Sequence, residues 1–156
     1  MRRMGMRSAF VTLATGGALF IAMSNPAAAA EEVNKGVPSG APSGGTCITE
    51  ITGATGCFQP YGDVIYIRDN SFDGYSVYVK WQNELRNPSG VWHSYRNGKC
   101  TSDRGSGDWA KCDKDFYEAS SKNALGGKGS RIKLTACVAS IGDDECATSP
   151  WLSNDG

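Results

Sequence analysis

The sequence predicts an all-β fold: a small antiparallel β-sandwich or barrel-like domain cross-linked by disulfides. Short stretches alternate between apolar and polar residues, clusters of Gly, Asn, Asp, Ser and Pro separate them, and six cysteines fall in three close pairs. No segment after residue 30 sustains the 3.6-residue period of an amphipathic helix. Short strands joined by turns are therefore the expected architecture.

The first 30 residues are predicted to be a signal peptide. Three arginines within the first seven residues precede the apolar run Ala9–Met23, and the small residues Ala27–Ala30 follow. Charge, apolar stretch and small residues in this order are typical of a secretory signal. The apolar run is shorter than the ~20 residues that a membrane-spanning helix needs. We therefore expect cleavage near Ala30 and a secreted, extracellular product with no membrane attachment.

Residues 31–46 are expected to form a flexible arm ahead of the domain. This segment holds six Gly or Pro residues and only two large apolar residues, both Val. Such a composition buries too little apolar surface to offset the entropy lost on ordering. The predicted domain is then residues 47–156.

The charge balance argues against a nucleic-acid partner. The chain has 16 Lys and Arg against 16 Asp and Glu, but residues 1–30 contain three Arg and no acid. The remainder therefore has 13 basic and 16 acidic residues, a net charge of −3. A nucleic-acid binder would need a basic face for phosphate contacts. No motif calls for a cofactor.

The cysteines are expected to form disulfides rather than a metal site. Six cysteines allow 15 connectivities, and their spacing favours bridges between neighbours. A zinc site is disfavoured because the chain has no Cys-x-x-Cys and a single His. An exported chain also meets an oxidising compartment. The expected pairs are Cys47 with Cys57, Cys100 with Cys112, and Cys137 with Cys146.

The strands are expected in the following order. Asp63–Arg68 is β-branched and aromatic, and Tyr75–Trp81 alternates with Tyr75, Val77, Val79 and Trp81 on one face. Ser76, Tyr78 and Lys80 then lie on the other face. Between these strands, Asp69–Gly74 resembles the start of a calcium loop, but Lys80 occupies the position of the bidentate Glu. A hairpin turn is therefore expected there.

The second half of the chain continues this pattern. Asn97-Gly98 predicts a hairpin turn between Val91–Arg96 and Lys99–Thr101, because both residues tolerate positive φ. Arg131–Ser140 alternates again and should bury its Ile, Leu, Ala and Val face. Asp115–Ser121 is compatible with either a strand or a short helix.

Aromatic residues provide the best indication of function. Ten Tyr or Trp residues lie in about 110 residues after the arm, and outward-facing rings can stack on sugars or contact a protein. The candidate binding residues are Tyr78, Tyr95 and Trp109. The alternative is that these rings fill a core that is poor in Leu and Ile.

Catalytic residues are not expected. The only histidine, His93, lies in a predicted strand without a recognisable nucleophile or acid partner. The acids lie mostly in turns, and no pair stands out for glycoside hydrolysis. Asp143–Glu145 could offer oxygens to a cation, but a solvated turn is the simpler interpretation.

Gly56–Asp63, followed by Asp73–Ser76 and Trp81, resembles a group of small secreted actinobacterial proteins with no assigned activity. Cys100, Cys112 and Cys137 fit the same pattern, so the resemblance covers roughly residues 57–138. It implies export, disulfides and a β-rich domain, and it adds no catalytic residue.

These observations predict a secreted, non-enzymatic binding protein whose partner is a protein or a glycan. A small secreted hydrolase, either a nuclease or a glycosidase, is the first alternative. A protease inhibitor is the second, with Arg104 or Lys111 presented between Cys100 and Cys112.

Overall fold

The structure, a computed structural model, describes residues 30–155, so the predicted signal peptide up to Ala29 lies outside the described residues. The described chain forms strands and no helix. The strands are β1 (Glu32–Lys35), β2 (Val37–Ser39), β3 (Thr46–Ile48), β4 (Ala54–Gln59), β5 (Val64–Asp69), β6 (Val77–Arg86), β7 (Trp92–Ser102), β8 (Trp109–Asp113), β9 (Ser130–Val138), β10 (Glu145–Thr148) and β11 (Leu152–Ser153).

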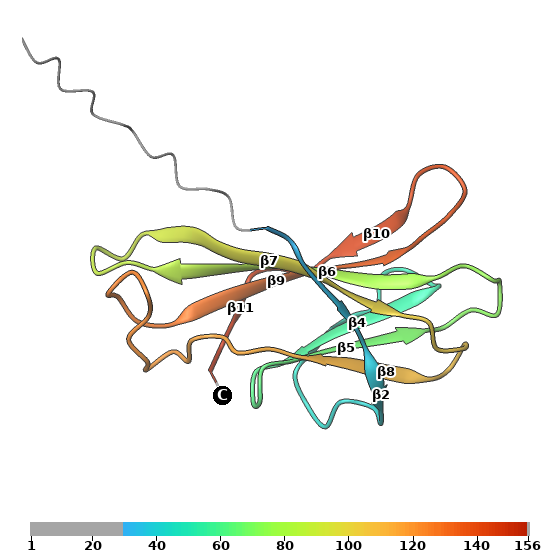
Figure 1. The fold of residues 1–156 in the computed structure, drawn as a ribbon, viewed down its shortest axis with the longest axis horizontal. Coiled ribbons are helices and arrows are strands. Elements are labelled where there is room, and N and C mark those ends of the chain that lie inside the picture. Colours follow the sequence, from blue (N-terminus) through green and yellow to red (C-terminus); the bar gives the residue numbers. More distant parts are fainter. Residues whose placement is uncertain (1–29, 156) are drawn as a thin grey trace, which may run out of the picture.

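Two sheets pack face to face (Figure 1). The first has the order β1-β7-β6-β9-β10, and the short β11 also pairs with β9. The second has the order β2-β8-β5-β4-β3. All pairings are antiparallel except that of β1 with β7. The predicted all-β, sandwich-like fold is confirmed, and the two sheets do not close into a barrel.

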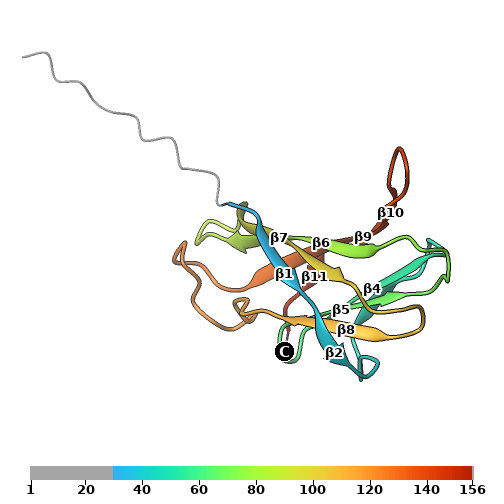
Figure 2. The same cartoon turned by 45° about the vertical axis from the view of Figure 1, so that its right-hand side comes forward.

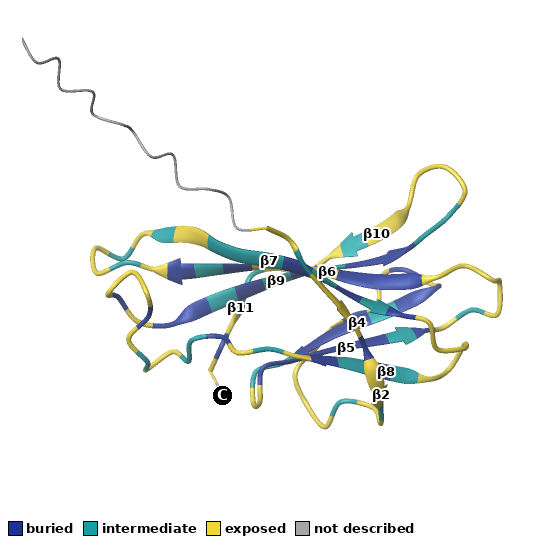
Figure 3. Ribbon diagram, viewed as in Figure 1, coloured by how far each residue is buried: buried dark blue, intermediate teal, exposed yellow. Residues whose placement is uncertain are grey.

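The core lies between the sheets and follows the period-two pattern. Val77, Val79 and Trp81 point inward from β6, and β9 adds Ile132 and Leu134; each is at most 2% exposed. The predicted inward faces of both strands are therefore confirmed, except that Tyr75 lies in a loop. The facing sheet contributes Phe58, Ile65, Ile67 and Ala110. Figure 3 shows β6 and β9 as largely buried ribbons and the connecting loops as largely exposed.

The flexible-arm prediction is wrong for residues 32–39. β1 pairs with β7 at the edge of one sheet, and β2 pairs with β8 at the edge of the other. Glu32 accepts hydrogen bonds from Arg96 at 2.7 Å and Lys114 at 3.4 Å. Backbone pairing and these ion pairs order the segment, although it buries few apolar side chains.

A single glycine carries the chain from one sheet to the other. Gly36 separates β1 from β2, and its N–H donates to the Thr101 carbonyl at 2.8 Å. A Cβ at this position would lie 3.0 Å from the Ala110 Cβ. The missing side chain allows the chain to cross closely over the side of the sandwich, as Figure 2 shows.

The predicted hairpin at Asn97-Gly98 is also wrong, because β7 runs straight through both residues. A Cβ on Gly98 would lie 2.3 Å from the Glu32 carbonyl oxygen and 2.5 Å from the Trp81 ring. Gly98 therefore permits close packing within a strand. The turn between β6 and β7 lies earlier, at residues 87–91, where Gly90 has a φ of 86°.

Two further connections differ from expectation. Asp69–Gly74 does not close a hairpin, because β5 and β6 belong to different sheets. It begins the crossover between them, and the N–H groups of Ser71 and Tyr75 donate to the Asp69 and Asp73 carboxylates. Asp115–Ser121 adopts neither a strand nor a helix.

All three predicted disulfides are confirmed. Cys47–Cys57 and Cys137–Cys146 each join residues directly opposite each other on neighbouring antiparallel strands. Cys100–Cys112 instead connects β7 with β8, and therefore links the two sheets.

Candidate binding site

Four loops gather at one end of the sandwich. The pairing registers bring the start of β4 beside the end of β5, and the start of β6 beside the ends of β7 and β9. The connections that leave these strand ends must therefore lie together. They are the β3–β4 loop (49–53), the β5–β6 loop (70–76), the β7–β8 loop (103–108) and the β9–β10 loop (139–144).

Each disulfide closes the base of one of these loops. The bridges enclose the β3–β4, β7–β8 and β9–β10 loops, with sequence separations of 10, 12 and 9 residues. Closing a loop of this length restricts the unfolded chain by about 3 kcal/mol in the chain-entropy model. The cross-links are therefore concentrated at one end of the molecule.

The remaining loop is held by hydrogen bonds to the other three. Asn70 N–H donates to the Gly53 carbonyl at 2.9 Å, and Gly107 N–H donates to the Asp69 carbonyl at 2.8 Å. At its far end, the Ser76 carbonyl accepts from Ala139 N–H at 2.8 Å. All four loops thus form one connected surface, which we call the loop end.

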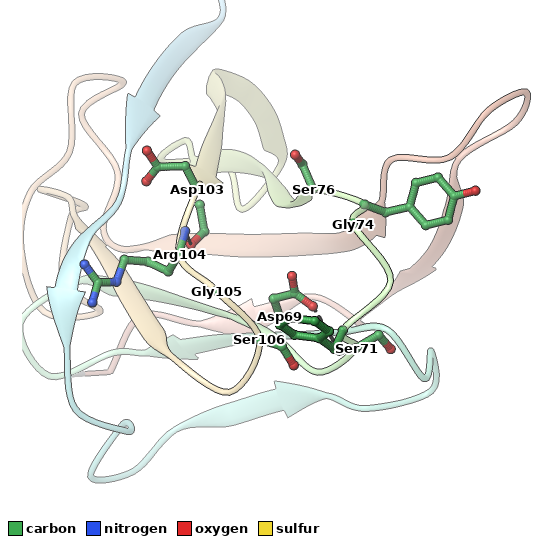
Figure 4. Close-up of a pocket in the computed structure, with 11 residues that line it drawn as sticks. Asp69, Ser71, Gly74, Ser76, Asp103, Arg104, Gly105 and Ser106 are labelled. Atoms are coloured by element: carbon green, nitrogen blue, oxygen red, sulfur yellow. Dashed lines mark hydrogen bonds between the residues drawn. The ribbon is translucent and has the colours of Figure 1, made fainter.

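A hollow of about 350 Å³ lies in the loop end, between the β5–β6 and β7–β8 loops (Figure 4). We call it the loop groove. Four serines, two aspartates, one arginine and two aromatic residues line it. Of the rings, Phe72 is 99% exposed and Tyr75 40% exposed. The polar residues are Asp69, Ser71, Ser76, Ser102, Asp103, Arg104 and Ser106.

The charged groups of the loop groove are partly paired. Asp103 lies 2.6 Å from Lys35, and the hydrogen bond from Lys35 lowers the pKa of the Asp103 carboxyl. Arg104 pairs with Asp108 at 3.4 Å. Figure 4 shows Asp103 and Arg104 on one side of the hollow and Gly74 and Ser76 on the other. Hydroxyls and carboxylates beside exposed rings suit a ligand rich in hydroxyl groups.

A second hollow of about 430 Å³ continues from the loop groove onto the sheet surface. It shares Ser76, Ser102 and Asp103 with the first and extends to Tyr78 and Lys99. The loop end therefore opens toward the outer face of the first sheet.

Tyr78 lies on the predicted outer face of β6, but the expected exposed ring is wrong. Its residue is 5% exposed, with the Lys99 ammonium 3.7 Å and the Lys80 ammonium 5.5 Å from the ring centroid. Its hydroxyl donates to the Asp144 carboxylate. Burial and this carboxylate raise the pKa of Tyr78 to about 12. The phenol is therefore neutral and held in place, without an open face for stacking.

The other two candidate residues lie elsewhere. Tyr95 is half-buried and packs against Tyr117, with ring centroids 6.2 Å apart. Trp109 is half-buried on the second sheet, edge-on to Tyr66 and beside the Arg68 guanidinium. The structure thus does not bring the three predicted binding residues together.

The residues considered for the alternative functions also have structural partners. His93 is exposed, and its Nε2 lies 2.9 Å from the Asn87 side-chain nitrogen, outside the loop groove. Lys111 lies within β8 and pairs with Asp113 at 3.1 Å, so it does not sit on an exposed loop. Arg104 does lie on the loop predicted for an inhibitor.

Within residues 30–155, no group of three or more His, Cys, Asp or Glu is arranged to hold a metal ion. Asp144, the central residue of the acidic turn, instead accepts the Tyr78 hydrogen bond. Over the same part of the chain, no helix is long and apolar enough to cross a membrane.

Sequence reasoning missed the loop groove and its exposed rings. The cysteine spacing correctly indicated three closed loops, but nothing local in the sequence showed that they share one end with Phe72 and Tyr75. Comparison with protein-family models, curated proteins and solved structures finds no match to this chain. The resemblance to small actinobacterial proteins therefore stays a prediction.

Proposed function

We propose that this chain is an exported binding protein that holds a hydroxyl-rich ligand, a glycan, in the loop groove and performs no chemistry on it. The observation that carries the proposal is the groove itself: serines, aspartates and exposed rings between one loop closed by the Cys100–Cys112 bridge and one loop held by hydrogen bonds to its neighbours. Such loops lose little conformational freedom on binding, which favours affinity. The three disulfides are consistent with an extracellular location.

The test is binding of the mature chain, residues 31–156, to an array of glycans, with Tyr75→Ala compared against Tyr61→Ala. Tyr61 is 80% exposed but lies on the β4–β5 connection, at the opposite end of β5. Truncating a stacked ring at an interface centre commonly costs about 2 kcal/mol, or roughly a thirtyfold loss of affinity. We expect that loss for Tyr75→Ala and none for Tyr61→Ala. Equal binding by both variants, or capture of a protein partner without any glycan, contradicts the proposal.

His93 separates the binding function from the hydrolase alternative. His93→Ala should leave the melting temperature and ligand binding unchanged, because the ring is exposed, lies outside the loop groove and contacts the exposed Asn87 amide. Assays of the secreted protein on RNA and on polysaccharides provide the measurement. A hydrolytic activity that disappears in His93→Ala, while the protein stays folded, would replace the binding proposal with a hydrolase.

A further inference from the structure

The outer face of the first sheet concentrates basic side chains on three adjacent strands. Lys80 of β6 lies directly opposite Lys99 of β7. Lys133 of β9 lies opposite Gln82, which is the next residue after Lys80 on the same face of β6. Arg131 follows on β9, opposite Glu84. We call these four cations, Lys80, Lys99, Arg131 and Lys133, the basic band.

The basic band is only partly neutralised by its neighbours. Arg131 pairs with Glu84, but none of the ion pairs found within residues 30–155 includes a lysine of the band. Like charges directly opposite each other on a sheet are destabilising. The pairing of Lys80 with Lys99 therefore costs stability, which the Asp144 carboxylate and the Tyr78 ring offset in part.

The charge of the chain is unevenly distributed around this band. With Glu84 and Asp144 counted as its neighbouring acids, the band has a net charge of +2. The other charged residues of 31–156 comprise 9 basic and 14 acidic side chains, a net charge of −5. A positive face on an otherwise negative molecule attracts and orients an anionic ligand.

Aromatic rings hold the cations in position. Every member of the band lies over at least one ring, at a distance where cation–π attraction operates. This support fixes flexible side chains before a ligand arrives and so reduces the entropy lost on binding. The contacts are Lys99 and Lys80 with Tyr78, Arg131 with Trp92 at 4.5 Å and Trp151 at 4.4 Å, and Lys133 with Trp151 at 4.5 Å.

We propose that the basic band binds an acidic polysaccharide, whose carboxylates contact the lysine ammonium groups. Around the cations, the amides of Gln82 and Asn97 face each other across β6 and β7, and the hydroxyls of Thr135 and Thr148 lie 2.9 Å apart. Amides and hydroxyls are suitable partners for sugar hydroxyl groups. No member of the band lines the loop groove itself, although the second hollow connects that groove with Lys99. The proposal does not depend on a ligand in the loop groove.

A nucleic acid fits the same face less well. Single-stranded nucleic acids bind by stacking bases on exposed rings, whereas Tyr78 is buried and the half-buried Trp92 and Trp151 face the protein's own cations.

The test uses the mature chain and polygalacturonate as the acidic polysaccharide, with dextran as the neutral one and mixed-sequence DNA as the other polyanion. One triple variant changes the three band lysines to Gln: Lys80→Gln, Lys99→Gln and Lys133→Gln. The matched control removes the same charge elsewhere: Lys111→Gln, Lys122→Gln and Lys128→Gln. Near-UV circular dichroism and melting temperature confirm that each variant is folded.

We expect the wild type to bind polygalacturonate but not dextran, and to bind more weakly as NaCl rises from about 50 to about 200 mM, because bound counterions are released. The band variant should lose at least about tenfold in affinity, while the control stays within about twofold. Tyr75→Ala should bind polygalacturonate like the wild type, since the loop groove is a different site. If the triple variant does not fold, Lys80→Gln alone should show a smaller loss in the same direction.

Three outcomes would overturn the proposal. The first is absence of polygalacturonate binding, and the second is an equal loss in band and control variants, which would indicate unspecific attraction. The third is DNA binding at least as tight as polygalacturonate binding, which would assign the face to nucleic acid. Loss of polygalacturonate binding in Tyr75→Ala would also contradict the proposal, because it would place the polysaccharide in the loop groove. Failure of Tyr75→Ala to affect the glycan array, by contrast, would refute only the loop groove.

Discussion

Lys114 is a buried cation, and two residues of β1 stabilise its charge. Only 3% of its side chain is exposed, and it contacts the Glu32 carboxylate at 3.4 Å and the Asn34 side chain. Burial lowers the pKa of Lys114, and the Glu32 carboxylate opposes that shift. A single acidic residue at the start of β1 therefore compensates a buried charge that follows β8, 82 residues later in the chain.

Replacing this acid should destabilise the protein. Glu32→Gln leaves Lys114 and Arg96 without their carboxylate, which we expect to lower the free energy of unfolding by about 1–2 kcal/mol, less than for a fully buried pair because water screens Glu32. Urea unfolding at neutral pH measures the effect. Glu31→Gln, at an exposed neighbouring position, provides the control. An unchanged free energy for Glu32→Gln would show that the ion pairs contribute nothing net.

Glu32 should also affect how the free energy of unfolding falls at acidic pH. Burial alone would raise the pKa of Glu32, but Arg96 and Lys114 outweigh burial and lower it below its ordinary value of 4.5. A lowered pKa in the folded state contributes stability that is present above pH 4.5 and lost as pH falls through the folded value. Glu32→Gln should therefore remove part of the loss seen on acidification, and the two proteins should converge in stability at low pH.

Tyr78 shows at the same scale why an outward position does not guarantee an exposed ring. Its place on the outer face follows from alternation, but Lys99 of β7 and Asp144 of the β9–β10 loop cover it together with Lys80 of its own strand. The ring that was expected to stack on a ligand instead positions the cations that we propose contact one.

Strand β7 depends on the absence of one side chain. At Gly98, the Trp81 ring and the Glu32 carbonyl occupy the space that a Cβ would need. The Trp81 ring itself is 1% exposed and packs edge-on against Phe116 at 5.4 Å. Gly98 thus allows the central Trp and the edge strand β1 to pack against the same point of β7.

Adding one methyl group there should test this packing. Gly98→Ala should lower the free energy of unfolding by about 1–3 kcal/mol through overpacking, and hydrogen exchange should rise first in β1. Gly105→Ala is the matched control, because a Cβ there meets nothing within 4 Å. Equal stability of the two variants would mean that β1 and Trp81 shift without cost.

At the scale of the whole molecule, the three disulfides are not equivalent. Cys100 and Cys112 are buried in the main core and link the sheets, whereas Cys146 is exposed on the edge strand β10. Each bridge closes a loop of similar length, so the entropic contribution is similar. Any difference in their contribution to stability should therefore come from how deeply each bridge is buried in the core.

Replacing both cysteines of one bridge at a time should show that Cys100–Cys112 contributes more stability than Cys137–Cys146. Cys100→Ala with Cys112→Ala should lower stability by about 3 kcal/mol or more, because the core loses sulfur atoms as well as a cross-link. Cys137→Ala with Cys146→Ala should cost less. Both variants are compared by urea unfolding, and a larger loss for the second pair would contradict the assignment of Cys100–Cys112 as the central cross-link.

Cleavage of the predicted signal peptide determines where the mature chain begins. The secreted product should begin near Glu31, just before β1, and should contain no methionine, since all four lie in residues 1–30. N-terminal sequencing and intact mass of the extracellular protein provide the measurement. A secreted protein that retains Met1–Met23 would refute the signal-peptide prediction.

Local patterns in the sequence determined most of β5, β6, β7 and β9, the inward faces of β6 and β9, and the three neighbouring disulfides. Alternation and loop closure operate within about a dozen residues, so they can be read without knowing the rest of the fold. Only the tertiary structure decided that residues 32–39 join both sheets, that β7 continues through Gly98, and that four loops meet at one end. It also decided that Lys99 of β7 lies beside Tyr78 of β6, across from Lys80. Each of these features depends on the register between strands distant in sequence, and that register sets which side chains meet.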